Sequence, residues 1–173
     1  MDVARIGRDL TMFVGWREEV KAMQLSSARG VLLIDCHRLK ATLGPIPETC
    51  LDDVCAMLLA MVRERVDAVS NLMQGAITTA TRPPAALVEF VTFSQFVRSL
   101  PAVSVSAEHA VGVIDQLFTL LERHGFDVPP AQKAERSLVH ATHRRFRSAV
   151  TKAVDVQGTP VPFFFYILGW CGC

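Results

Sequence analysis

The chain has 173 residues, of which 50% are apolar and 20% are charged, and its net charge is +1. This length allows one ordinary domain with its own hydrophobic core, and the near-neutral charge gives no reason to expect broad attraction to nucleic acid. The five cysteines are an odd number without regular spacing, which favours free thiols in a reducing compartment over a disulfide framework.

The first segment of the chain, residues 2–24, has apolar side chains at mostly helical spacing and predicts a helix. Charged residues occur from Asp2 onward, so the segment lacks the uninterrupted apolar core of a secretory signal peptide. Serines and a glycine at 26–30 predict a loop. The apolar run at 31–35 fits either a short strand or a buried helical segment, and it is the one plausible strand in this sequence.

A long second helix is predicted between two pairs of prolines. Apolar residues recur every three or four positions over 51–80, which draws one stripe along a helix about 50 Å long. Pro45 and Pro47 mark its start, and we expect the helix to begin just after Pro47. Pro83 and Pro84 mark its end, because a proline disfavours the helical conformation of the residue before it.

Three more amphipathic segments follow the second pair of prolines. Residues 85–100 predict a third helix, and a loop rich in Val and Ser is expected after Pro101. A fourth helix is predicted from Glu108 to Gly125, because glycine is the typical residue just after a helix C-terminus. Residues 131–152 predict a fifth helix with positive charge near its C-terminal end.

These patterns predict an all-α fold, an elongated array of about five amphipathic helices with at most one short strand near 31–35. The residues expected to matter are packing positions and turn-forming prolines rather than reactive groups. They are Trp16, Pro45, Pro47, Pro83, Pro84, Phe90, Phe93, Phe96, Leu117 and Phe118.

Possible reactive sites each have a simpler interpretation. His140 and His143 are three residues apart on a helix, and Cys171 with Cys173 would complete four ligands for zinc. The simpler interpretation is a pair of histidines on a basic, solvated helix end, so we expect no metal and no other cofactor. Cys55 lies on the apolar stripe of the second helix, where a thiol fills space as a small hydrophobe.

Two further patterns are equally weak as functional signals. Cys36 and His37 are adjacent, and neighbouring side chains usually point in different directions, so a Cys-His nucleophile is not expected. The cluster Arg144, Arg145, Arg147 and Lys152 would suit acidic tubulin or nucleic acid. A short basic run on a near-neutral chain is more often a solvated helix end, and we expect no nucleic-acid binding.

The order of these signals resembles the tail of dynein heavy chains, especially axonemal ones. The resemblance rests on Trp16 in the first helix, GVLLIDCHRLKATLGPIPETCLDDV at 30–54, RPPAALVEFVTFSQFVRSL at 82–100 and DQLFTLLERHGFDV at 115–128. An L-x-P-x-P turn before a long helix and a P-x-x-x-x-E-F-V element that opens the next helix are features of that family. The matching positions are Leu43, Pro45, Pro47, Pro84, Glu89, Phe90 and Val91.

The resemblance covers residues 10–150 and implies a small slice of the tail, shortly before the linker of a very long motor chain. It implies a scaffold role in dynein complex assembly and microtubule-based movement, with other heavy, intermediate or light chains as partners and microtubules as an indirect one. Cytoplasm, cytoskeleton and ciliary axoneme are the implied locations. No GxxxxGK[ST] phosphate-binding loop occurs in this sequence, because no glycine precedes a lysine, so we expect no ATPase activity.

The last segment, 151–173, departs from the polar helical continuation expected of that family. Its VPFFFYILGW run at 161–170 is apolar but about half the roughly 20 residues that a membrane-spanning helix needs. We therefore divide the chain into a helical dynein-like segment at 1–150 and a divergent, poorly ordered apolar tail at 151–173. The alternative function is a free-standing helical protein whose apolar tail docks on a membrane interface or a partner.

Overall fold

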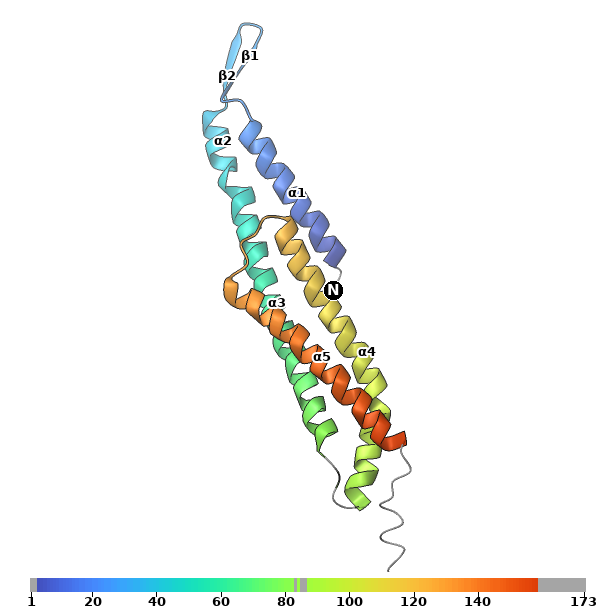
Figure 1. Cartoon of the computed structure of the whole chain (residues 1–173). Coiled ribbons are helices and arrows are strands. Elements are labelled where there is room, and N and C mark those ends of the chain that lie inside the picture. Colours follow the sequence, from blue (N-terminus) through green and yellow to red (C-terminus); the bar gives the residue numbers. More distant parts are fainter. Residues whose placement is uncertain (1–2, 83, 85–86, 159–173) are drawn as a thin grey trace, which may run out of the picture. The chain divides into compact units, whose positions relative to one another are not determined.

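The computed structural model describes residues 3–82, 84 and 87–158 (Figure 1). Most of these residues are helical, which confirms the predicted fold class, and one small β-hairpin interrupts the helices. The elements are α1 (Val3–Ala22), β1 (Ser26–Arg29), β2 (Leu32–Asp35), α2 (His37–Leu43), α3 (Pro45–Thr81), α4 (Leu87–Arg123) and α5 (Pro130–Gly158). No helix in this described part is both long enough and apolar enough to cross a membrane.

The chain divides into two compact units, and the divisions fall inside α3 and α4. The first unit consists of Met1–Glu64 and Val113–Pro130, and the second of Arg65–Gly112 and Ala131–Cys173. Each unit has its own set of buried apolar side chains.

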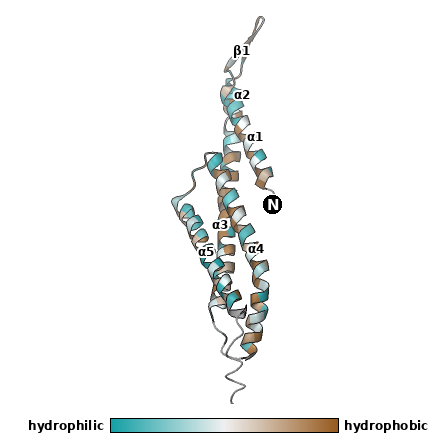
Figure 2. Ribbon diagram, turned by 45° about the vertical axis from the view of Figure 1, so that its right-hand side comes forward, coloured by the Kyte–Doolittle hydropathy of each residue, from teal (hydrophilic) through white to brown (hydrophobic). Residues whose placement is uncertain are grey.

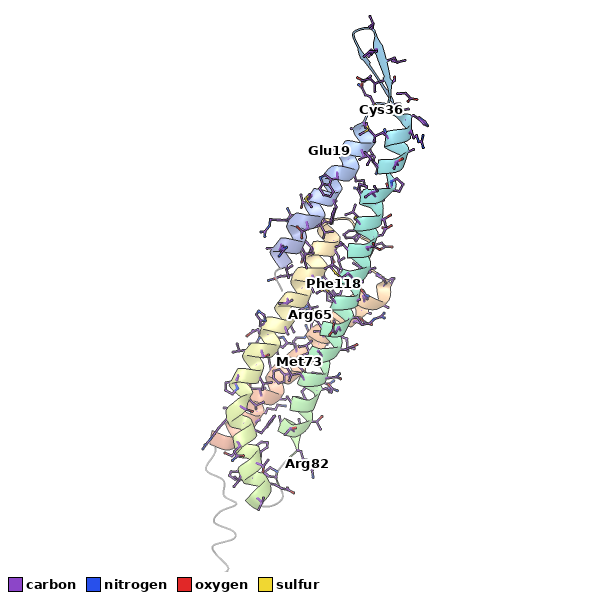
Figure 3. The ribbon with its side chains drawn as sticks, turned by 180° about the vertical axis from the view of Figure 1, so that it is seen from behind. Glu19, Cys36, Arg65, Met73, Arg82 and Phe118 are labelled. Atoms are coloured by element: carbon purple, nitrogen blue, oxygen red, sulfur yellow. The ribbon has the colours of Figure 1, made fainter. Side chains whose placement is uncertain are left out.

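The core of the first unit is formed by α1 and by parts of α3 and α4. The side chains buried most deeply there are aliphatic, apart from one phenylalanine that Figure 3 labels, and they recur at helical spacing. They are Leu10 from α1, Leu58 and Val62 from α3, Ile114, Leu117, Phe118 and Leu121 from α4, and Val128 after α4.

The hairpin of the first unit corrects the sequence prediction. Residues 26–30 were expected to form a loop, but β1 pairs antiparallel with β2, and Arg29 lies opposite Leu32 at the end of the ladder. The connection is therefore the two-residue turn Gly30-Val31, in which Gly30 has φ 62°. A positive φ at the first turn residue is typical of the type II′ turns that join two strands tightly, and glycine adopts it without steric cost.

A short helix that the sequence analysis did not predict, α2, links the hairpin to α3. Gly44 between them is helical, with φ −53° and ψ −49°, and its N–H donates to the carbonyl of Lys40 at 2.9 Å. α3 begins at Pro45, so Pro47 lies inside its first turn rather than before its start. Both prolines are tolerated because amide groups in the first turn have no carbonyl partner within their own helix.

The core of the second unit consists of apolar stripes on three helices. Figure 2 shows the hydrophobic residues of α3 and α4 in brown, whereas α5 is largely hydrophilic apart from its buried positions. The buried residues are Val66, Val69, Met73 and Ala76 on α3, Phe93, Val97, Leu100, Ala107 and Val111 on α4, and Val139, Phe146, Ala149 and Ala153 on α5. Their steps of three, four or seven residues keep each stripe on one side of its helix.

The predicted break after Pro101 is wrong, because α4 is one continuous helix with Pro101 inside it. Proline lacks an N–H, so the carbonyl of Val97 loses its helical partner, at a cost of about 3 kcal/mol. The apolar stripe nevertheless passes the proline, since Leu100 and Ala107 are both fully buried and the half-buried Ser104 lies between them. Burial of this stripe on both sides of Pro101 offsets the lost hydrogen bond.

The end of α4 confirms the predicted role of Gly125. This residue has φ 71°, and its N–H donates to the carbonyl of Glu122 at 3.1 Å. The N–H of Phe126 donates to the carbonyl of Leu121, also at 3.1 Å. These two bonds form a Schellman motif, which satisfies carbonyls that have no partner within the helix.

The last helix is longer than predicted. α5 extends to Gly158, six residues beyond the expected end at 152. Residues 151–158 of the predicted tail are therefore helical, whereas the apolar run at 161–170 lies outside the described residues.

Candidate interaction surfaces

The predicted packing residues occupy different environments. Leu117 and Phe118 are fully buried in the first unit, and Phe93 is buried in the second. Phe96 is half-buried against the cluster formed by Phe93, Val97, Leu100 and Ala153. Phe90 is also half-buried.

Trp16 lies on the surface of α1, although it was predicted to be a packing position. It is 46% exposed. Its ring meets that of Phe13 edge to face, with the ring centroids 5.5 Å apart. This pair contributes a local aromatic contact on one helix rather than a part of the core.

The turn after α3 is only partly described. α3 ends at Thr81, where a turn was predicted, and Pro84 is half-buried. Pro83, the other predicted turn residue, lies outside the described residues. Pro84 also lines a cavity of about 340 Å³ in the second unit, together with the buried Phe93 and Ala153 and the exposed Arg82 and Lys152.

An open groove of about 770 Å³ lies between α1 and α4 in the first unit. The two helices approach closely there, because a Cβ built on Gly7 would lie 3.2 Å from the Leu120 Cδ1 atom. Arg8, Asp115 and Arg123 line the groove together with neutral side chains. This mixed, open surface suits contact with another protein better than enclosure of a small substrate.

Lys40 fastens the base of the hairpin to the end of α1. Its Nζ atom donates to the carbonyls of Lys21 at 2.7 Å and of Met23 at 2.9 Å. A cation at a helix C-terminus satisfies unpaired carbonyls and interacts favourably with the helix dipole. The N–H of Cys36 donates to the Leu25 carbonyl at 2.8 Å and closes the hairpin.

The three described cysteines are free thiols in partly buried positions. Burial raises the pKa of the Cys55 thiol, and the nearby Asp52 carboxylate raises it further. A raised pKa keeps the thiol protonated and unreactive, which agrees with the predicted space-filling role. Cys36 lies where β2 meets α2 (Figure 3), and the following residue, His37, donates its backbone N–H to the Asp35 Oδ1 atom at 2.9 Å.

The predicted alternative of a metal site has no support in the described residues. His140 and His143 are half-buried on α5, and the parts of the chain that the structure describes contain no group of three or more His, Cys, Asp or Glu residues able to hold a metal. Cys171 and Cys173 lie outside those parts.

The basic cluster of α5 lies on the surface, as predicted. Arg144, Arg145, Arg147 and Lys152 are all exposed, and within the described residues none of them forms an ion pair. In the first unit, by contrast, Lys21 is 3.9 Å from Glu48 and Arg17 is 3.1 Å from Glu18.

Gln132 is a buried polar residue that the sequence analysis missed. It is 5% exposed, and its Oε1 atom has no hydrogen-bond partner among the residues that the structure describes. Its burial could have been predicted from its position seven residues before Val139, which places it on the buried stripe of α5. A buried amide without a partner on that stripe weakens the packing.

Comparison with known proteins finds a distant similarity in sequence. The chain is 24% identical over 168 residues to human dynein axonemal heavy chain 6. The match leaves five residues of the chain uncovered, so it also reaches into the segment 151–173. No protein-family model matches the sequence.

The match covers 97% of this chain but only 4% of the human protein. The chain therefore spans a small fraction of the length of the relative that it matches. This packed set of helices is distantly similar to a short stretch of a dynein heavy chain.

Proposed function

We propose that this chain is a non-catalytic helical scaffold segment of a dynein heavy chain tail, placed shortly before the linker. The observation that carries the proposal is the similarity of 97% of the chain to a dynein heavy chain. Its buried residues support the same role, because they form stripes along helices. Such stripes hold long helices together and allow them to transmit force.

The partners that fit this role are other dynein heavy, intermediate or light chains, with microtubules bound only indirectly. The corresponding locations are the cytoplasm, the cytoskeleton and the ciliary axoneme. ATP hydrolysis would be supplied elsewhere in the complex, since the chain has no Gly-Lys pair with which to build a phosphate-binding loop. We expect the purified chain to hydrolyse ATP no faster than the buffer.

The proposal can be tested by affinity capture of the tagged chain from ciliated cells, followed by mass spectrometry. The matched control is Phe118→Asp, which places a charge in the core of the first unit and should unfold it. We expect dynein chains to be enriched with the original chain and lost with the variant. Recovery of membrane proteins without dynein chains, or equal recovery of dynein chains with the variant, would contradict the proposal.

A further inference from the structure

Positive charge is concentrated on α5. This helix contains six Lys and Arg residues and two acidic residues, a net charge of +4, whereas the whole chain carries +1 and the remainder therefore −3. The excess does not come from the general composition of the chain. It belongs to one helix, whose opposite side is buried in the core of the second unit.

The basic residues of α5 form a continuous stripe. Lys133, Arg136, His140, Arg144 and Arg147 succeed one another in steps of three or four residues, which places them on one side of the helix. From Lys133 to Arg147 the stripe is about 21 Å long at the usual helical rise. No acidic residue interrupts it between Lys133 and Arg147, because Glu135 falls on another side of the helix and Asp155 lies beyond Arg147.

Three cations of this stripe have no ion pair within the described residues. Lys133, Arg144 and Arg147 are exposed, and within the described residues they have no ion pair or hydrogen bond from their side chains. Like charges three or four residues apart on a helix repel one another and destabilise it slightly. An acidic partner would remove this repulsion and add favourable contacts.

We propose that the basic stripe on α5 is a docking surface for a protein segment rich in aspartate and glutamate. Charge complementarity favours this partner, because Arg side chains present planar forks that bind carboxylates through paired hydrogen bonds. A ladder of carboxylates about 21 Å long would match the stripe. This inference does not depend on the relationship to dynein.

Two other classes of polyanion fit less well. A helix that binds a lipid surface buries an apolar side in it, but the apolar side of α5, including Val139 and Phe146, is buried in the protein. Single-stranded nucleic acid is usually bound by basic side chains together with aromatic ones on which bases stack. The stripe has no Phe, Tyr or Trp residue, since the one phenylalanine of α5 is fully buried.

The test compares two double variants of the whole chain that remove equal charge from the same helix. Arg144→Gln with Arg147→Gln interrupts the stripe, whereas Arg145→Gln with Lys152→Gln removes two cations from the other flank of α5. All four positions are exposed, so both variants should retain the fold, which circular dichroism would verify. The probe is a fluorescently labelled poly-glutamate peptide, and its binding is monitored by fluorescence anisotropy at low and at physiological salt.

We expect saturable binding that weakens with salt and a loss of affinity of about fivefold in the stripe variant, against less than about twofold in the flank variant. Equal losses in the two variants would show only non-specific attraction and overturn the proposal. Absence of binding at low salt would overturn it as well. Tighter binding to an oligothymidine strand or to phosphatidylserine vesicles than to poly-glutamate would assign the stripe to a different partner and overturn the proposal too.

Discussion

Different interactions stabilise each of the two units of this chain. The first unit uses local devices, namely the Gly30 turn, the Lys40 side chain on the end of α1, and the Schellman motif at Gly125. The second unit depends on repeated apolar residues along three helices, and its α4 continues through Pro101. Sequence changes at single special residues should therefore affect the first unit, whereas changes in helix continuity should affect the second.

The largest expected effect comes from the core of the first unit. Replacing Phe118 with Ala removes a fully buried ring, and we expect the free energy of unfolding to fall by about 3–5 kcal/mol in urea denaturation. Trp16→Ala is the control of similar chemistry, since this ring is 46% exposed and should cost less than about 1.5 kcal/mol. Equal losses in the two variants would contradict the placement of the core.

A smaller effect of opposite sign is expected in the second unit. Pro101 is exposed, so Pro101→Ala removes little packing and restores the hydrogen bond to the Val97 carbonyl. We expect the free energy of unfolding to rise by about 1–3 kcal/mol. If the chain instead formed a loop after residue 101, the variant would be neutral or destabilised in the same measurement.

Replacing glycine with alanine should change the stability of the two units in opposite directions. Gly125 has φ 71°, a conformation that alanine adopts with strain, so Gly125→Ala should destabilise the first unit by about 1–2 kcal/mol. Gly112 lies inside α4 of the second unit, and a Cβ added there would meet open space among the described residues, so Gly112→Ala should stabilise by about 0.5–1 kcal/mol. Thermal unfolding of both variants checks the pair, and a shift in the same direction would argue against it.

The smallest expected effect is a pH dependence at the end of α4. Burial lowers the pKa of His124, and the neighbouring Arg123 lowers it further. The folded chain therefore binds fewer protons than the unfolded chain when the pH falls below about 6.5, and stability decreases there. The free energy of unfolding should fall less between pH 7.5 and pH 5.5 in His124→Asn than in the original chain. An equal fall in both would show that His124 does not cause the pH dependence.

Much of the helical fold could be predicted from the sequence. The periodic apolar residues of α3 predicted a helix correctly, and the glycine after α4 predicted the end of that helix correctly. Both signals are local. The break at Pro101 was predicted wrongly, since a proline signal is local while the burial of Leu100 and Ala107 depends on packing against other helices. The stripe that passes the proline at 97, 100, 104 and 107 was present in the sequence, but Ser104 made it less visible.

The hairpin and the surfaces were harder to predict. β1 has the polar sequence SSAR, and it becomes a strand only because the Gly30 turn places it beside β2. The basic cluster was recognised, but its continuity with Lys133 and Arg136 becomes significant only when the opposite side of α5 is known to be buried. The exposure of Trp16 could not be predicted, because helical spacing does not show which side of α1 meets other helices.

Continuous apolar stripes support the proposed role of the chain, and α4 is the helix in which that continuity can be tested most directly. Native-state hydrogen exchange across residues 93–121 measures it. We predict protected amides throughout residues 102–107, at levels comparable with those near Leu117. Rapid exchange of this segment between two protected helices would contradict a continuous α4 and the scaffold built on it.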